Sequence, residues 1–212
     1  RAEHSLTHDK PRFAFFQVFQ PRGGGKRQAP TFDVIAPGVA KHEEEIVLAP
    51  GAEPAADPNL VLRVAVAAAE FGLPIAPGTL RNLKKCPIGD RNWTDESREL
   101  FIRLLASGPA LLNVWEDIDF IDVPGKLIPE WLGVRNRPSA SAAHRYTIDR
   151  HMVEVVTRLG RETPSGGRYD DRHYEALLLA GILHDIGKRP GVANHAAEGA
   201  RPVSYTHLTL PT

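Results

Sequence analysis

The stretch that decides the fold is Tyr174-Glu-Ala-Leu-Leu-Leu-Ala-Gly-Ile-Leu-His-Asp-Ile-Gly-Lys188. Its first part, Tyr174 to Leu183, is strongly apolar and predicts a buried helix. The helix runs directly into His184 and Asp185, which places a carboxylate at the end of an apolar segment. Burying an unpaired carboxylate costs on the order of several kcal/mol, so Asp185 should have a metal ion or a cationic neighbour as its partner.

A second helix is expected about thirty residues upstream, opening with His144-Arg-Tyr-Thr-Ile-Asp-Arg-His151. Its apolar face comprises Ile148, Met152, Val155, Val156 and Leu159, and His151 lies beside that face. His151, His184 and Asp185 together offer the nitrogen and oxygen donors that divalent Mn, Fe, Zn or Mg use, with waters completing the shell. An isolated His-Asp pair is more often a surface or capping pair, but this apolar and Gly-Lys context predicts a metal site that acidifies a bound water.

Two further residues are catalytic candidates with open alternatives. Lys188 could stabilise the charge that develops on a phosphate or could complement a helix C-terminus, and we favour the first role. His195, within Asn194-His-Ala-Ala-Glu-Gly199, could bind the metal or a substrate phosphate, or could be an ordinary loop histidine. His173 stands among charged residues and is expected on the surface.

The chain upstream of these motifs is expected to be helical, after a minor β element. Two short strands are expected at residues 31–35 and 45–48. Asp57 and Pro58 favour a helix start, and Gly72 favours its end. A further helix should begin at Thr94 and end at Gly108, and shorter helices should cover residues 111–118 and 129–132.

Other features have ordinary structural interpretations. Trp115 and Trp131 are expected in the core, because aromatic residues at helical spacing usually pack there. The charged run Lys41-His-Glu-Glu-Glu45 is interpreted as a solvated face. The polar and small residues of Arg135 to Ala143 indicate a boundary between two helical units.

The composition limits the classes of function. The chain has 212 residues, 42% of them hydrophobic, which is typical of an ordinary globular protein. Lys plus Arg and Asp plus Glu both number 26, so net charge gives no attraction to nucleic acid or to an anionic membrane. The single cysteine, Cys86, and the lack of a long apolar run favour the cytoplasm.

Both ends of the sequence suggest a piece of a longer protein. Residues 1–20 resemble the middle of a chain, so an upstream domain is expected. Pro202-Val-Ser-Tyr-Thr-His-Leu-Thr-Leu-Pro-Thr212 resembles the in-frame translation of a sequencing adapter of the transposase type, although a Thr-rich strand would have a similar composition. His207 is therefore not a ligand candidate.

Three segments in order carry a family resemblance: Pro129-Glu-Trp-Leu-Gly-Val-Arg-Asn-Arg-Pro138, His144 to His151, and Leu183-His-Asp-Ile-Gly-Lys188. They resemble the bifunctional PII uridylyltransferase and uridylyl-removing enzymes of the actinobacterial type. Ile35-Ala-Pro-Gly-Val39 and Ala55-Ala-Asp-Pro58 are similar to the region that joins the nucleotidyltransferase and HD domains of that family.

The resemblance implies a mainly α fold, in which a helical linker domain precedes a truncated HD-type domain and a small β element lies near the N-terminus. Residues 1–50 would end the nucleotidyltransferase region, 51–136 would form the linker, and 137–201 would begin the HD phosphohydrolase domain. Residues 202–212 would be the adapter translation. ACT domains that sense glutamine would follow in the intact protein.

The implied activity is attachment of UMP, or AMP, to the nitrogen regulatory protein PII, and its removal by metal-dependent phosphodiester hydrolysis. Mg or Mn would be held by His151, His184 and Asp185, with Fe or Zn as alternatives, and UTP or ATP would bind the upstream domain. Gly23-Gly-Gly25 lacks the acidic pair of the transferase site, and a final Asp ligand is expected beyond Arg201, so this chain alone should be inactive. A stand-alone HD phosphohydrolase of a nucleotide and a non-catalytic helical module stay open.

Overall fold

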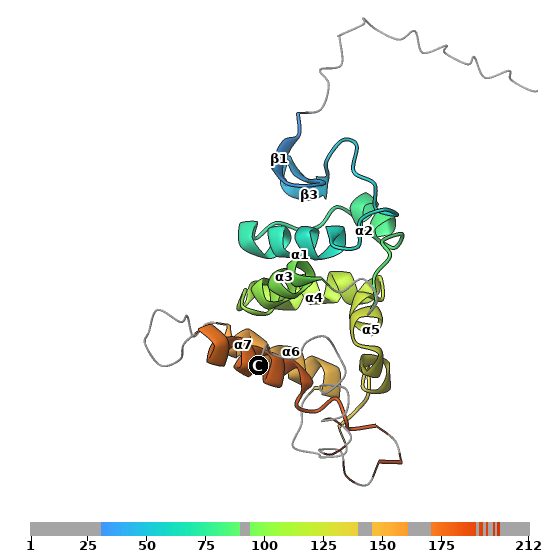
Figure 1. Ribbon diagram of the computed structural model, residues 1–212, viewed down its shortest axis with the longest axis vertical. Helices are drawn as coiled ribbons and strands as arrows, with labels where there is room; N and C mark the ends of the chain where they lie inside the picture. Colours follow the sequence, from blue (N-terminus) through green and yellow to red (C-terminus); the bar gives the residue numbers. More distant parts are fainter. Residues whose placement is uncertain are drawn as a thin grey trace, which may run out of the picture. The chain divides into compact units, whose positions relative to one another are not determined.

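The computed structural model describes residues 31–89, 94–139, 146–160, 171–189, 191, 192, 194, 197 and 199. This part of the chain is mainly helical and has a small sheet at its N-terminal end, as Figure 1 shows. The expected fold class, mainly α with a minor β element, is therefore confirmed. The described residues from Thr31 onward form one compact unit, and the domain boundaries at residues 50 and 136 stay predictions.

The sheet is an antiparallel meander of three short strands, β1 (Asp33–Ala36), β2 (Val39–His42) and β3 (Glu45–Leu48). The sequence predicted only the first and the last of them. Two tight turns frame β2, with Gly38 and Glu43 at φ values of 74° and 54°. The second half of β2, Lys41 and His42, belongs to the charged run that the sequence analysis interpreted as a solvated face. Glu43 and Glu44 are exposed, as expected of a solvated charged run, but the strand before them buries Val39 and Ala40.

Helix α1 (Leu60–Phe71) packs against β2 and β3 and buries Leu60, Val64 and Ala68. It begins later than predicted, because Asp57 is outside the helix and its Oδ1 accepts the backbone N–H of Asn59 at 3.0 Å. The helix ends as predicted at Gly72, whose φ of 64° is in the left-handed region that suits glycine.

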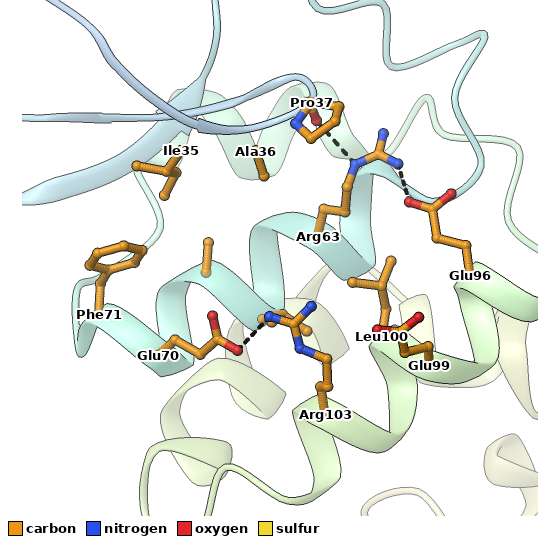
Figure 2. A pocket seen from close by; sticks show the side chains of 12 residues that line it. Ile35, Ala36, Pro37, Arg63, Glu70, Phe71, Glu96, Glu99, Leu100 and Arg103 are labelled. Atoms are coloured by element: carbon orange, nitrogen blue, oxygen red, sulfur yellow. Dashed lines mark hydrogen bonds and ion pairs between the residues drawn. The ribbon is translucent and has the colours of Figure 1, made fainter.

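Arg63 on α1 connects the sheet to the helices (Figure 2). Its Nε donates to the carbonyl of Pro37 at 3.0 Å, and its guanidinium also pairs with Asp57 and with Glu96. Burial acts to raise the pKa of Glu96, but the hydrogen bonds from Arg63 and Asn59 outweigh it and lower that pKa. The buried guanidinium therefore satisfies three acceptors from separate parts of the fold.

Helices α3 (Asp95–Leu105) and α4 (Ala110–Phe120) pack on α1. The predicted start at Thr94 is confirmed by a capping box, in which the Thr94 side chain accepts from Ser97 N and Ser97 Oγ accepts from Thr94 N. Helix α3 ends at Leu105, before the turn at Gly108, and α4 extends beyond both predicted ends.

The described chain is more helical than the sequence suggested, both before α3 and after α4. Helices α2 (Pro77–Leu83) and α5 (Val123–Leu127) were not predicted, whereas the 3-10 turn η2 (Pro129–Gly133) matches the short helix expected there. Trp115 and Trp131 are buried, with ring centroids 5.2 Å apart, so their assignment to the core is confirmed.

Helices α6 (Ile148–Leu159) and α7 (Asp171–Leu183) pack directly on each other. Helix α6 also contacts α4, and α7 also contacts α3. Ion pairs support both contacts, since Arg150 on α6 pairs with Glu116 and Arg98 on α3 pairs with Glu175. None of the helices in the described ranges is long and apolar enough to cross a membrane.

Candidate metal centre

The first turn of α6 positions His151. The helix begins at Ile148 rather than at His144, which lies outside the described residues. Asp149 fixes this start, because its Oδ2 accepts the backbone N–H of Asn136 at 2.8 Å. Asn136 has a φ of 55°, a left-handed conformation that asparagine tolerates better than most residues.

The end of α7 positions His184. Its Nδ1 lies 2.9 Å from the carbonyl oxygen of Gly181, and a carbonyl only accepts, so Nδ1 carries the proton and donates. The lone pair of the neutral ring is then on Nε2, which lies 3.4 Å from Asp185 Oδ2. The backbone therefore holds the imidazole in the tautomer and orientation that a metal ligand needs.

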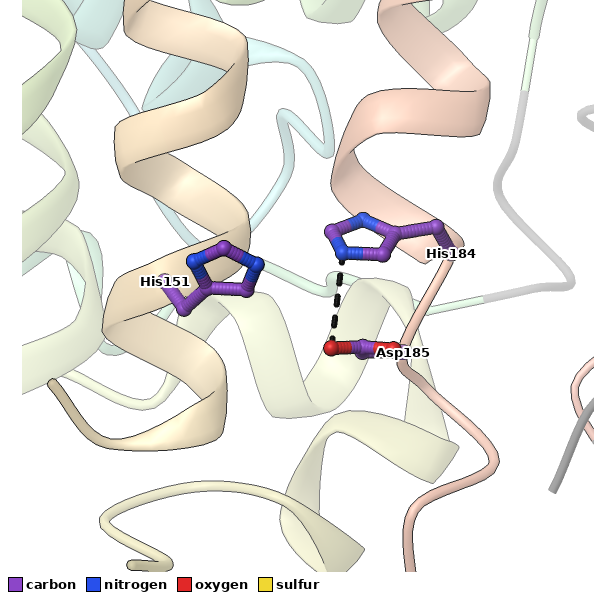
Figure 3. A group of neighbouring side chains, drawn as sticks. All are labelled: His151, His184 and Asp185. Carbon is purple, nitrogen blue, oxygen red and sulfur yellow. Dashed lines mark ion pairs between the residues drawn. The ribbon is translucent and has the colours of Figure 1, made fainter. Parts of the chain in front are cut away.

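The three predicted ligand residues come together across two helices, as Figure 3 shows. One candidate ligand atom from each of His151, His184 and Asp185 lies within 4.8 Å of the other two. Ligand distances of roughly 2.0 to 2.6 Å place donors of one ion at most ~4 to 5 Å apart, so this separation is compatible with a shared ion. The donor set of two imidazoles and one carboxylate fits a divalent cation.

Gly181 permits the close approach of the two helices. A Cβ at this position would lie 2.9 Å from Leu159 Cδ1 and 3.0 Å from Val156 Cγ2, both on α6. A side chain at this position would therefore force Leu159 or Val156 to shift, or the two helices to separate. The glycine that interrupts the apolar run Tyr174–Leu183 is the sequence signal for this contact, and the sequence reasoning did not use it.

Lys188 also belongs to this group. Its Nζ lies 2.7 Å from Asp185 Oδ2, and its backbone N–H donates to the carbonyl of Asp185 at 2.9 Å. Asp185 is buried, with 10% of its side chain exposed, so the ammonium provides the cationic neighbour that the sequence required as one of two alternatives. The spacing of three residues could have revealed this pair.

Of the remaining candidates, only His173 lies among the described residues. His195 lies outside the described residues, as do Gly23-Gly-Gly25 and the adapter-like tail, so their interpretations stay predictions. His173 is exposed on α7, as expected. The fold and the group together define a class, namely a mainly helical protein segment with a compact His-His-Asp group carried by two packed helices.

Comparison with known proteins adds the family. The chain is 39% identical to a bifunctional uridylyltransferase/uridylyl-removing enzyme of Streptomyces coelicolor, in an alignment that covers 84% of this chain and 21% of the relative. It is also 39% identical to the enzyme of that name from Mycobacterium tuberculosis, over 78% of this chain and 20% of the relative. The Corynebacterium glutamicum enzyme is 34% identical over 73% of this chain and 22% of its own length.

The chain therefore belongs to the family of bifunctional uridylyltransferase/uridylyl-removing enzymes, and the resemblance seen in the sequence is confirmed. It spans about a fifth of the length of the curated relatives it matches. No family model matches the chain, and no solved structure gives a significant match.

Proposed function

We propose that this chain is a segment of an enzyme that attaches a nucleotidyl group to PII and removes it, and that it contributes to the removing site. The observation that carries the proposal is the convergence of His151, His184 and Asp185 from two helices. The name of the relatives supports it, because one of the two activities in that name is removal of a uridylyl group.

A divalent ion at this group, with Mg or Mn preferred over Fe or Zn, would lower the pKa of water and polarise a phosphodiester. The protein residues have distinct parts in this proposal. His184 presents Nε2 because Gly181 holds its Nδ1 proton, and Asp185 supplies the negative charge. Lys188 brings an ammonium close to the reacting phosphate, and His195 is the remaining candidate for a substrate or metal contact.

The partners of the whole enzyme follow from the same proposal. The bond to be cleaved joins the nucleotide to a tyrosine of PII, a cytoplasmic signalling protein, and the nucleotide is UMP or AMP. Attachment uses UTP or ATP in a nucleotidyltransferase domain outside this chain, and glutamine binds to further domains. Residues 51–136 would then be the helical linker, and residues 137–201 the first part of the hydrolase domain.

The proposal is tested in the full-length enzyme that carries this segment. His184→Ala and Asp185→Ala should each abolish release of the nucleotide from modified PII, followed by mass spectrometry over time. Attachment should continue, because the transferase site lies elsewhere. His173→Ala is the matched control, since His173 is an exposed histidine on the same helix. Metal-dependent release that persists in both site variants would contradict the proposal.

A further inference from the structure

We infer that Lys188 is a built-in counter-ion that occupies Asp185 in the metal-free protein, so that a divalent cation must displace its ammonium in order to bind. This inference rests on the proposed function, because it concerns the same group of side chains. It assigns Lys188 a position in competition with the metal, rather than only a contact with substrate.

The contact geometry places the lysine on the oxygen that a metal would need. Lys188 Nζ lies 2.7 Å from Asp185 Oδ2, and the same oxygen lies 3.4 Å from His184 Nε2. This oxygen therefore faces both the ammonium and Nε2 of the imidazole. An ion bound jointly by Asp185 and His184 would have to contact the oxygen that already accepts from the lysine.

Because both are cations, the Lys188 ammonium and a divalent metal ion should not occupy the same oxygen of Asp185 together. Asp185 has only 10% of its side chain exposed, so its carboxylate requires a nearby cation. Once a divalent ion neutralises it, an ammonium on the same oxygen would repel that ion at short range. Lys188 has 31% of its side chain exposed and a flexible four-carbon stem, so its ammonium can swing toward solvent while the stem stays in place.

The exchange has a consequence for the site. In the metal-free protein the buried carboxylate is compensated, so the local fold does not depend on metal. When metal enters, the ammonium is released within reach of a bound phosphodiester. The positive charge of Lys188 thus becomes available to substrate only in the metal-loaded protein.

The test measures binding of Mn²⁺ alone by isothermal titration, in the full-length enzyme that carries this segment, as the binding that His184→Ala removes. Lys188→Met keeps the length of the side chain and removes its charge, and it should bind Mn²⁺ about tenfold more tightly than the wild type, or about 1.4 kcal/mol. Lys188→Arg keeps the charge and should remain close to the wild type. His184→Ala removes a ligand and should weaken binding strongly.

Lys41→Met is the matched control. Lys41 pairs with Asp33 at 3.1 Å on the sheet and is 30% exposed, nearly the same as Lys188, but its partner is 67% exposed. Its Mn²⁺ affinity should equal that of the wild type. In chelator, Lys188→Met should also unfold at a lower temperature than Lys41→Met, because it leaves Asp185 without its cation, and Mn²⁺ should reverse this loss.

The outcomes separate the two proposals. If the wild type and all lysine variants fail to bind Mn²⁺, the proposed metal site is refuted. The proposed competition between Lys188 and the metal is then refuted as well. If the wild type binds but Lys188→Met binds equally or more weakly, the competition alone is refuted. Should Lys188→Met fail to fold even with Mn²⁺, Lys188→Gln carries the same prediction of tighter binding.

Discussion

Replacement of Gly181 tests whether the close packing of α6 and α7 holds the candidate site together. In Gly181→Ala the added methyl would lie 2.9 Å from Leu159 Cδ1 and 3.0 Å from Val156 Cγ2. Such overpacking costs about 1 to 3 kcal/mol, whereas Ala in place of Gly inside a helix gains about 1 kcal/mol. The net expectation is a loss of about 0 to 2 kcal/mol in the free energy of unfolding.

Gly181→Val should cost more, about 3 kcal/mol, because it adds methyl groups to the same contact and gains less helix propensity. In a chain of this size, each kcal/mol corresponds to about 2 to 4 °C in Tm. A separation of the helices should also pull His184 from His151, whose ring centroids lie 5.3 Å apart. Mn²⁺ affinity should therefore fall with stability across the series Gly, Ala and Val.

Urea unfolding and Mn²⁺ titration measure these two effects. Gly78→Ala is the control, because a Cβ at that helical glycine meets only Arg81 Nη2, at an ordinary 3.7 Å. This variant should be neutral or slightly stabilised, with unchanged metal affinity. Equal stabilisation by Gly78→Ala and Gly181→Ala would refute the packing argument, and full Mn²⁺ affinity in Gly181→Val would refute its link to the site.

Two other predictions concern the scaffold. Thr94→Ala removes the acceptor for Ser97 N in the capping box and should lower stability by about 0.5 to 2 kcal/mol in urea unfolding, whereas Thr94→Ser should retain most of it. Burial raises the pKa of Cys86 from 9.0 to about 11, so the unfolded thiol ionises first as the pH rises. The contribution of Cys86 to stability is thus fully present below pH 9.0 and is lost toward about pH 11, and Cys86→Ala should lose less stability between about pH 8 and about pH 10.

The sequence predicted those elements whose signals are local. The start at Thr94 follows from a cap residue before acidic residues, and α7 follows from a long apolar run. Three short elements, β2, α2 and α5, were missed, because short elements depend on contacts from elsewhere. Helix α5, for example, follows Asp122 at a φ of 67°, a left-handed conformation that aspartate tolerates but that residue type alone does not specify.

In the candidate site, too, the residue types could be predicted from local sequence, but not every contact between them could. The ligand residues His151, His184 and Asp185 could be chosen from residue type and order, and the structure brings them together. The contacts that orient them could not be chosen in this way. The hydrogen bond from His184 to Gly181 depends on how the chain turns at the end of α7, which residue patterns do not specify, whereas the pairing of Lys188 with Asp185 could have been read from their spacing.

The helix contacts described above form a closed loop: α1 touches α3 and α4, α3 touches α7, α4 touches α6, and α6 touches α7. Each of these five helices therefore contacts two others of the loop. Helix α1, which also bonds to the sheet end through Arg63 and Pro37, is connected to α7 through α3 and to α6 through α4. The sheet end of the segment and the His-His-Asp group are therefore joined by two separate routes of direct helix packing.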